Sequence, residues 1–317
     1  MTDTNVIMAT YNGQSYICEQ IRSIDRQTVS VNKIIVVDDG SRDGTVDEIQ
    51  KVAKQINTPI EVHINERNIG VIKTFEKALN LCDADFIAFC DQDDVWLPNK
   101  MEKILSEFDA DKDVPQLVYS DLKCVDADLK VLNESFIRHH LNDETYKDKP
   151  FNFLALGNFI PGCAMVINKS LKEKALPFPP SIIMHDYWLA LLACKGGRLK
   201  CVNEPLVLYR RHSSTVTSMR RSTNCFYDIV MFLPRLIRDL KSALSAKYDS
   251  TDLKTITYLL EEMVKRLSLK DEEVNNLISI FKNGGIKSYS RLKHLKSPYK
   301  SKLFFKLLSV HRKNLKQ

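Results

Sequence analysis

Residues 86–98 read FIAFCDQDDVWLP. The first five are apolar, as in a buried strand, and three of the next four carry carboxylates. Two earlier segments have the same form, namely NVIMATYNG at 5–13 and KIIVVDDGS at 33–41, and a shorter strand-like run lies at 60–64. Amphipathic stretches at 16–27, 45–55 and 70–81 have helical spacing and separate these strands. This alternation predicts an α/β domain with a parallel sheet and helices on both faces.

Three of the predicted strands end in polar clusters, which are Thr10-Tyr11-Asn12, Asp38-Asp39 and Asp91–Asp94. In open α/β sheets ligands bind beyond the carboxyl ends of strands, so we expect one shared site. The carboxylates of residues 91–94 repel one another unless water or a cation lies between them. Mg²⁺ and Mn²⁺ accept one or two carboxylates together with substrate phosphate oxygens. The segment therefore predicts either a metal–diphosphate site or a solvated acidic turn.

The Asp38-Asp39 pair has two interpretations. A carboxylate there can accept a hydrogen bond from a base or a ribose hydroxyl. It can also cap the helix that begins near Thr45. Both hold if one carboxylate caps and the other faces a ligand. Neither G-x-G-x-x-G nor G-x-x-x-x-G-K-[ST] occurs, which argues against a dinucleotide dehydrogenase and a P-loop NTPase.

The remainder of the chain is less regular. We expect strands at 116–120 and 206–211, a turn at 126–129, a charged loop at 143–149 and a Gly-containing turn leading into a strand within 158–167. A helix is predicted at 183–195, with His185 and Asp186 in its first turn. Beyond residue 220 the pattern is helical. The pattern predicts an α/β domain at 1–219 and a helical region at 220–317.

Charge is distributed unevenly along the 317 residues. The net charge is +6, yet residues 1–219 contain 25 basic and 31 acidic side chains, whereas residues 220–317 contain 21 basic and 9 acidic ones. From residue 282 on, Lys and Arg are interleaved with apolar residues. The pattern fits a segment on an anionic membrane surface, which we expect as the partner, or a solvated helix. Nucleic acid is not expected, because no module of basic and aromatic residues accompanies the charges.

Other classes of protein are disfavoured. No apolar run approaches the roughly 20 residues that span a bilayer, and the N-terminus lacks the basic region of a secretory signal. The eight cysteines form no C-x-x-C pair, which disfavours a zinc site or a disulfide framework. We expect a cytoplasmic protein that is peripheral on the inner face of the cell membrane.

The ordered blocks VIMATYNG, IIVVDDGSRDGT, NIGVIKTFEKAL and FIAFCDQDDVWLPNKM together resemble the donor-binding half of family 2 glycosyltransferases. The blocks GNFIPGCAMVI, MHDYWLALLA and LYRRH extend the resemblance to about residue 215. It implies the GT-A fold, a Rossmann-like mixed sheet flanked by helices, with the donor half at 1–105 and the acceptor half at 106–219. The sequences of these blocks are most similar to those of bacterial rhamnosyltransferases of cell-wall, capsule and O-antigen synthesis.

The resemblance implies an inverting, metal-dependent transfer of a sugar from a nucleotide diphosphate to a glycan or a lipid-diphosphate-linked saccharide. dTDP-rhamnose is the first choice of donor, and a UDP-hexose such as UDP-glucose, UDP-galactose or a UDP-N-acetylhexosamine is the alternative. An alternative of another class is a sugar-nucleotide-binding or assembly protein without turnover. The intact set of Asp39, Asp93 and Asp186 argues against that alternative.

The resemblance also assigns roles to individual residues. Asp186 matches the catalytic base, for which we expect an ordinary carboxyl pKa of about 3.9. Mg²⁺ or Mn²⁺ would be held by Asp93, Asp91 and His212. The residues expected to bind the nucleotide sugar are Thr10, Tyr11, Asn12, Asp38, Asp39, Asn68, Gly70, Lys73, Asp91, Gln92 and Asp93. Those expected near the acceptor or the sugar are Trp96, Gly162, His185, Trp188 and Arg210. For both tryptophans, stacking on a sugar and packing in the core remain open.

Overall fold

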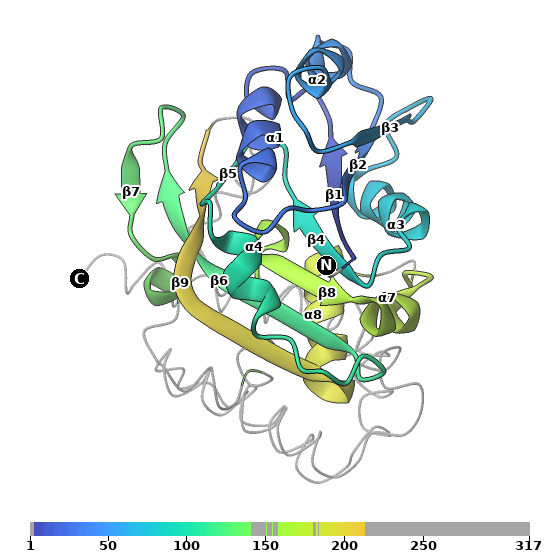
Figure 1. Ribbon diagram of the computed structural model, residues 1–317, viewed down its shortest axis with the longest axis vertical. Helices are drawn as coiled ribbons and strands as arrows, with labels where there is room; N and C mark the ends of the chain where they lie inside the picture. The colour runs from blue at the N-terminus through green and yellow to red at the C-terminus, as the bar shows by residue number, and fades with distance from the viewer. Residues whose placement is uncertain are drawn as a thin grey trace, which may run out of the picture. The chain divides into compact units, whose positions relative to one another are not determined.

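The computed structural model describes residues 3–140, 150, 154, 158–179, 182 and 184–212. Within these residues the chain forms one nine-stranded sheet (Figure 1). Its strand order is β3 (Ile60–Ile64), β2 (Lys33–Asp38), β1 (Thr4–Thr10), β4 (Phe86–Cys90), β8 (Met165–Asn168), β6 (Gln116–Val125), β9 (Arg198–Arg210) and β5 (Val95–Trp96), with β7 (Val131–Asn133) paired to β6.

The sheet is mixed, as the GT-A fold requires. β3, β2, β1 and β4 are parallel to their neighbours. β8 runs antiparallel to both β4 and β6, whereas β6 and β9 are parallel. The first half is therefore the parallel sheet predicted from the alternating pattern, and the second half inserts an antiparallel strand between two parallel blocks.

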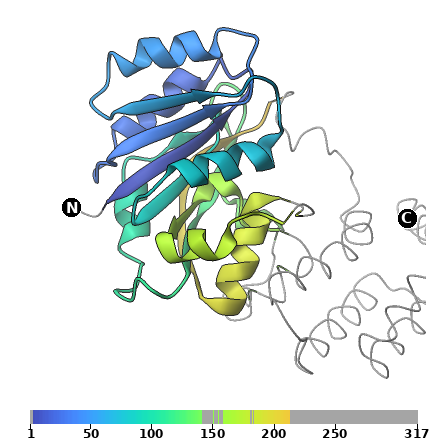
Figure 2. The same cartoon turned by 90° about the vertical axis from the view of Figure 1, so that its right-hand side faces the viewer.

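Helices cover both faces of the sheet, as Figure 2 shows. α1 (Ile17–Asp25) and α2 (Thr45–Ala53) pack together on one face. α3 (Val71–Leu81), α7 (Lys169–Ala175) and α8 (His185–Gly196) lie on the other face. The shorter helical elements are α4 (Lys100–Leu105), α5 (Phe136–His140) and the 3₁₀ turn η2 (Gly162–Ala164).

The alternation of side chains along the strands explains this layering. Val6, Met8, Ile34 and Val36 lie in one hydrophobic cluster with the buried face of α1, which presents residues 17, 21 and 24. These isoleucines recur at helical spacing and are at most 1% exposed. Burying each such side chain contributes roughly 1.5–3 kcal/mol, which fixes α1 on the sheet.

The strand register gathers the predicted polar clusters. Thr10 pairs with Asp38, and Met8 pairs with Cys90, the last residue of β4. The residues that follow β1, β2 and β4 consequently emerge at the same edge of the sheet. This placement agrees with the rule that led us to expect one shared site.

Two strands are longer than predicted. β6 continues to Val125 instead of ending at Ser120, and β9 begins at Arg198 instead of residue 206. The two strands pair along their length, with register shifts around Asp121, which lies opposite Pro205. Because proline donates no backbone N–H, a shift in register there costs little. The polar residues near Pro205 conceal this strand in the sequence pattern.

Several predicted segments lie outside the described residues, namely the charged loop at 143–149 and the basic region at 220–317. Among the described residues, no helix combines the length and apolar character needed to cross a bilayer.

Candidate active site

The DQDD loop, residues 91–94, connects β4 to β5. Asp93 is 9% exposed and Asp94 is fully buried, whereas Asp91 is half-buried. Asp94 Oδ1 accepts a hydrogen bond of 3.0 Å from the backbone N–H of Arg210. The loop is thus a packed element of the protein rather than a solvated acidic turn.

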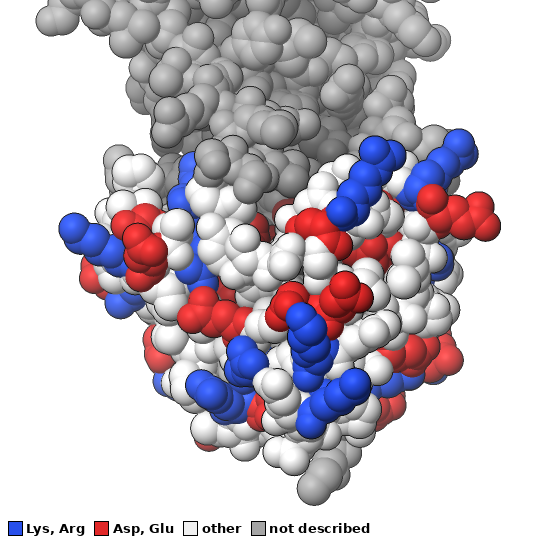
Figure 3. All heavy atoms as spheres, turned by 90° about the horizontal axis from the view of Figure 1, so that it is seen from above, with Lys and Arg blue, Asp and Glu red and all other residues white. Residues whose placement is uncertain are grey.

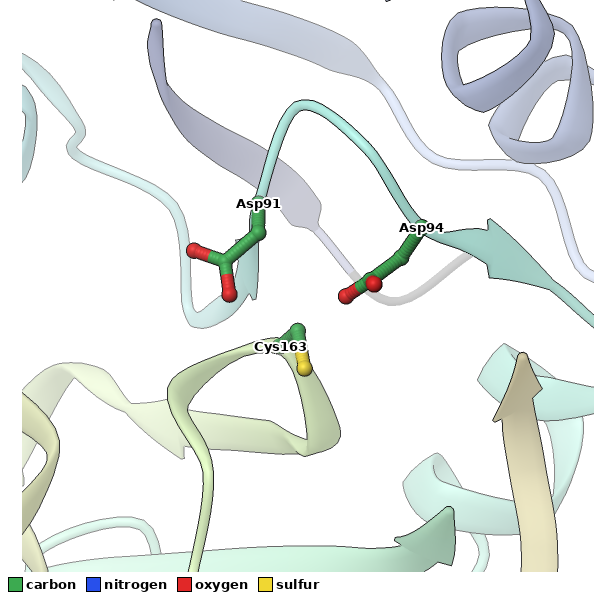
Figure 4. Close-up of side chains that lie close together, drawn as sticks. All are labelled: Asp91, Asp94 and Cys163. Carbon is green, nitrogen blue, oxygen red and sulfur yellow. The ribbon is translucent and has the colours of Figure 1, made fainter. Parts of the chain in front are cut away.

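Figure 4 shows the carboxylates of Asp91 and Asp94 together with the thiol of Cys163, which belongs to η2. One ligand atom from each of these residues lies within 4.8 Å of the others. The pKa of each carboxyl is raised, mainly by burial and further by the neighbouring charge of Asp93. The cluster therefore disfavours its own negative charge, and a cation would relieve that cost.

Lys100 is a buried basic group beside this cluster. Its Nζ donates a 2.7 Å hydrogen bond to the carbonyl of Cys163 and lies 3.3 Å from the ring centroid of Trp96. Burial lowers the pKa of Lys100 to about 7, so its ammonium is only a partial counter-charge for the carboxylates. Trp96 is 2% exposed, and the Lys100 ammonium lies over its ring.

His212 joins the same loop from the end of β9. Its Nε2 lies 2.8 Å from Asp93 Oδ2, and its ring centroid lies 4.8 Å from that of Tyr16. Of the three residues predicted to hold a metal, His212 and Asp93 are therefore in direct contact. Asp91 is in the adjoining cluster of Figure 4.

Asp186 lies in the first turn of α8 and is 8% exposed. Its Oδ2 accepts a 3.1 Å hydrogen bond from Gly162 N, and its Oδ1 accepts one of 2.6 Å from Tyr187 N. Gly162 immediately precedes Cys163, so η2 joins Asp186 to the cluster of Figure 4. The charge of Asp186 is among those that raise the pKa of Asp91.

The expected pKa of Asp186 was wrong. Burial raises it to about 7, and the hydrogen bonds from the backbone N–H groups of Tyr187 and Gly162 only partly oppose this rise. Desolvation of the anion therefore outweighs both these bonds and the dipole of α8. A carboxyl of this kind can exchange a proton near neutral pH.

The structure corrects the group predicted near the acceptor. Trp188 is 5% exposed, and its Nε1 donates a 3.2 Å hydrogen bond to Ala175 O. Trp96 is also buried, so for both tryptophans the structure favours packing in the core. His185 is 4% exposed and stacks on Phe75, with ring centroids 4.1 Å apart. Burial lowers the pKa of His185 to about 3, so the imidazole is neutral.

Gly162 and Arg210 complete that group. Gly162 contributes its backbone N–H to Asp186 and is itself buried. Arg210 is 2% exposed and directs its guanidinium into the protein. With Trp96, Trp188 and His185, they form the support around the site and offer no open surface to a sugar.

At the nucleotide end, Asp38 proves to be the internal carboxylate of its pair. It is fully buried, and its oxygens accept hydrogen bonds from Thr10 Oγ1 at 2.8 Å and from Ser41 N at 2.8 Å and Ser41 Oγ at 2.6 Å. Asp38 therefore stabilises the turn after β2, and its expected contact with the nucleotide stays a prediction.

Asp39 holds the loop that follows β3. It accepts hydrogen bonds from Asn65 Nδ2 at 2.9 Å, from Ile69 N at 2.8 Å and from Gly70 N at 2.9 Å. A carboxylate has about four acceptor positions, so one remains for a ligand. These bonds bring Asp39 beside Gly70 and the exposed Asn68, all three of which are predicted to contact the nucleotide.

The loop after β1 is held by side chains. Gln92 accepts from Tyr11 N at 2.8 Å and donates to Tyr11 O at 3.1 Å. Asn12 Oδ1 accepts from Arg42 N at 2.9 Å. The polar groups of Gln92 and Asn12 are thereby engaged, whereas the side chain of Tyr11 is 44% exposed. Lys73 forms a 2.6 Å ion pair with Glu76.

The charged side chains are unevenly distributed over the molecular surface (Figure 3). The face in Figure 3, toward which β1 and β4 run in Figure 1, carries acidic side chains in its middle and basic ones lower down and at its rim. An anionic diphosphate approaching that middle region would be repelled. A bound cation would change the sign of this interaction.

Sequence reasoning placed Asp94 in the predicted metal–diphosphate segment but gave it no individual role, and it did not identify Cys163 and Lys100 as members of the site. Asp94 was within the quoted DQDD motif, but the D-x-D pattern directs attention to its neighbours. Cys163 and Lys100 carry no local signal, because only folding brings η2 and α4 beside the loop.

Gly70 provides a first prediction, because its backbone has φ 88° and ψ 151°, a combination that glycine almost alone adopts. An added Cβ would meet no atom within 4 Å. Gly70→Ala should therefore lower the free energy of unfolding by about 1–3 kcal/mol through backbone strain alone. Denaturant unfolding measures this, with Ile69→Ala, at an exposed neighbour, as the control. Equal stability of the two variants would contradict the strain.

The chain is similar to one protein-family model and to several known proteins. A family model described as "Glycosyl transferase family 2" matches residues 5–174. A protein of Bacillus subtilis named "Putative teichuronic acid biosynthesis glycosyltransferase TuaG" is 32% identical over 68% of this chain and 81% of its own length. The dTDP-rhamnosyl transferase RfbG of Shigella flexneri is 28% identical over 65% of this chain and 72% of its own.

A third relative is named for another donor. The UDP-Glc:alpha-D-GlcNAc-diphosphoundecaprenol beta-1,3-glucosyltransferase WfgD of Escherichia coli is 26% identical over 68% of this chain and 79% of its own length.

Solved structures share the fold. TarS 1-349 of S. aureus in complex with UDP has a TM-score of 0.56 at 18% identity, covering 85% of this chain and 73% of the TarS 1-349 chain. The mannosyltransferase PcManGT of Pyrobaculum calidifontis, in complex with GDP-Man and Mn²⁺, has a TM-score of 0.53 at 17% identity, covering 98% of this chain and 86% of its own. The match of more than half of the chain to the family model, together with the mixed sheet, shows that this protein belongs to glycosyl transferase family 2 and is a glycosyltransferase.

Proposed function

We propose that this glycosyltransferase is metal-dependent and inverting, and that it transfers L-rhamnose from dTDP-rhamnose to a growing, lipid-linked polysaccharide of the bacterial surface. The observation that carries the proposal is the convergence of Asp186 with the DQDD loop. Gly162 binds Asp186, and the next residue, Cys163, belongs to the cluster with Asp91. A candidate base and a candidate diphosphate site, 95 positions apart in the sequence, thereby become neighbours.

The reaction follows from these roles. The acceptor hydroxyl oxygen attacks the anomeric carbon of the donor sugar, and Asp186 accepts the proton of that hydroxyl. The bond between the anomeric carbon and the diphosphate oxygen breaks, and the nucleoside diphosphate departs with the electron pair. A single displacement inverts the anomeric centre and needs one base only, so no covalent intermediate with the protein is required.

The residues at the DQDD loop fit a divalent cation. Asp91 and Asp93 offer the oxygen ligands that Mg²⁺ and Mn²⁺ prefer, and His212 adds an imidazole beside Asp93. When bound, such an ion would neutralise the negative charge that develops on the departing diphosphate. Burial and mutual repulsion of the carboxylates already favour a cation in this region.

The nucleotide half would bind the base and ribose through the residues after β1, β2 and β3. Asp39 keeps one acceptor position for a base N–H, and the exposed side chain of Tyr11 offers an aromatic surface. Thr10 and Asn12 fix the shape of this end, and Asn68, Gly70 and Lys73 would face the nucleotide and its phosphates.

The pH dependence provides a second prediction. Only the ionised form of Asp186 can accept a proton, and burial raises its pKa to about 7. The maximal rate should therefore fall about tenfold for each pH unit below the pKa of Asp186 and level off above it. A bound cation keeps Asp91 ionised and also favours the ionised form of Asp186, so at saturating Mn²⁺ the fall should begin below pH 7. A maximal rate that falls as pH rises through 7 would contradict the assigned role.

A donor screen tests the choice of sugar. The similarity to RfbG favours dTDP-rhamnose, and that to WfgD favours the alternative, UDP-glucose or another UDP-hexose. Thermal shift and release of nucleoside diphosphate should be measured with dTDP-rhamnose, UDP-glucose, UDP-galactose and UDP-N-acetylhexosamines. Stabilisation and turnover with a UDP-sugar, and neither with dTDP-rhamnose, would replace the first choice by the alternative.

The proposed acceptor and location rest on the relatives and on the basic region. TuaG and WfgD are named for teichuronic acid biosynthesis and for a diphosphoundecaprenol-linked acceptor, and we propose an acceptor of this lipid-linked class. The excess of 21 basic over 9 acidic residues at 220–317 supports binding to the inner, anionic face of the cell membrane. A chain ending at residue 280 that still sediments with anionic vesicles would argue against the role of residues 282–317.

A further inference from the structure

Arg210, the last residue of β9, makes contacts with three other parts of the protein. Its backbone N–H donates to Asp94 Oδ1 at 3.0 Å, and its Nε donates to the carbonyl oxygen of Asp93 at 2.7 Å. The two Nη atoms donate to the carbonyl of Ala127, in the β6–β7 turn, and to the carboxylate of Glu19, in α1. The same residue therefore holds both the Asp93 carbonyl and the Asp94 side chain.

Tyr16 lies against this arrangement, just before α1. The guanidinium carbon of Arg210 lies 4.7 Å from the Tyr16 ring centroid, and the His212 ring lies 4.8 Å from it. His212 in turn contacts Asp93. Figure 1 shows the end of β9 beside β5 and near α1, so these contacts join the two halves of the sheet at the DQDD loop.

Arg210 is chemically suited to fixing a loop. It is 2% exposed, and its partner Glu19 is half exposed, so the ion pair is anchored on the arginine side. A guanidinium is planar and carries five N–H donors in a rigid arrangement, which fixes the directions of several acceptors at once. Holding the Asp93 carbonyl sets the plane of the peptide between Asp93 and Asp94, and thereby the direction in which the Asp93 side chain leaves the backbone.

We propose that Arg210 is a positioning residue that holds the Asp93 carboxylate in the orientation in which it binds the divalent cation. The sequence had suggested a contact with the sugar or acceptor, and the buried guanidinium replaces that interpretation. This inference rests on the proposed function, because it assumes that Asp93 is a metal ligand. It adds that the affinity of the metal depends on a residue that does not touch the metal.

The test measures metal binding directly. Mn²⁺ alone is titrated into the purified full chain, and free Mn²⁺ is followed by electron paramagnetic resonance. Because residues that orient metal ligands typically contribute about 10–100-fold to affinity, Arg210→Met should weaken Mn²⁺ binding by about that factor. The matched control is Arg211→Met, the exposed neighbour whose guanidinium lies 5.9 Å from the Tyr209 ring centroid. It should bind Mn²⁺ within about twofold of the original chain, because its guanidinium makes no contact with the loop.

Kinetics separate positioning from a direct role. Arg210→Met should require more Mn²⁺ for half-maximal transfer and recover most of its kcat at saturating Mn²⁺. Unchanged Mn²⁺ affinity with a low kcat would overturn the proposal and indicate contact with substrate. Should Arg210→Met fail to fold, Glu19→Ala replaces it, because this change removes one acceptor of the guanidinium and leaves the loop intact. It should weaken Mn²⁺ binding to a smaller extent, and unchanged affinity would again count against the proposal.

The same titration distinguishes failure of the proposed metal site from failure of the positioning role of Arg210. An original chain that binds no Mn²⁺ would overturn the metal assignment of the proposed function, and the positioning role with it. Equal Mn²⁺ affinities of the original chain and Arg210→Met would overturn the positioning role alone.

Discussion

Asp186→Asn should lower the rate of sugar transfer by about 10²–10⁴-fold, the range that a positioned general base contributes, while donor affinity stays within about twofold. Asparagine has the shape of aspartate but cannot accept the proton of the acceptor hydroxyl. Its single carbonyl oxygen can keep only one of the hydrogen bonds from Gly162 N and Tyr187 N. The variant is measured by product formation and by donor titration, with a thermal melt to establish that it is folded.

The control for this change is Asp47→Asn. Asp47 lies in the first turn of α2, as Asp186 lies in the first turn of α8, but it is exposed. If Asp186 served only as a favourable charge at a helix N-terminus, both variants would lose a little stability and keep full activity. Full transfer by Asp186→Asn would therefore remove the base from the mechanism. A loss of donor binding equal to the loss of rate would assign Asp186 to the donor instead.

The first half of the fold was predictable because its signals are local. β1, β2 and β4 are short apolar runs that end at polar clusters, and the helices between the strands carry apolar residues at helical spacing. β3 was predicted with its observed bounds, Ile60–Ile64, and the ends of β1, β2 and β4 were correct to within one residue. The rule that ligands meet the carboxyl ends of such strands then placed Asp39 and the DQDD loop at one edge.

The support of the site was not predictable, because it depends on contacts between distant segments. Lys100 reaches Cys163, 63 positions away, and Arg210 reaches Asp93, 117 positions away. Neither pair leaves a periodic pattern in the sequence. The two tryptophans illustrate the same point, since their position beside acidic residues suggested sugar stacking, whereas packing buried them.

The choice between Asp38 and Asp39 also required the structure. Asp38 is the last residue of β2 and Asp39 follows it, and both are at most 3% exposed. What separates them is the identity of their partners: Asp38 binds the turn at Ser41, whereas Asp39 binds the loop that carries Asn68 and Gly70. Burial raises the pKa of Asp186 to about 7, whereas the residue type alone predicts the ordinary carboxyl value.

Asp93→Ala should lower the rate of transfer by about 10²–10³-fold, because a bound cation contributes several kcal/mol to stabilising the charge of the leaving group. The change removes one oxygen ligand and the partner of His212 Nε2. The matched control is Asp128→Ala, an exposed aspartate of the β6–β7 turn, which should keep its activity. Transfer is measured with and without added Mn²⁺ and after treatment with EDTA.

Comparing the chelator with the variant makes this test specific. EDTA should reduce the original chain to about the rate of Asp93→Ala, and it should change the rate of the variant little, because both treatments remove the same cation from the same place. Restoring Mn²⁺ should rescue the original chain fully and the variant only at much higher concentration. If transfer survives EDTA and Asp93→Ala is active, the metal has no part in the reaction. The buried Lys100 and the basic side chains in the lower part of Figure 3 would then be the groups that could balance the charge of the diphosphate.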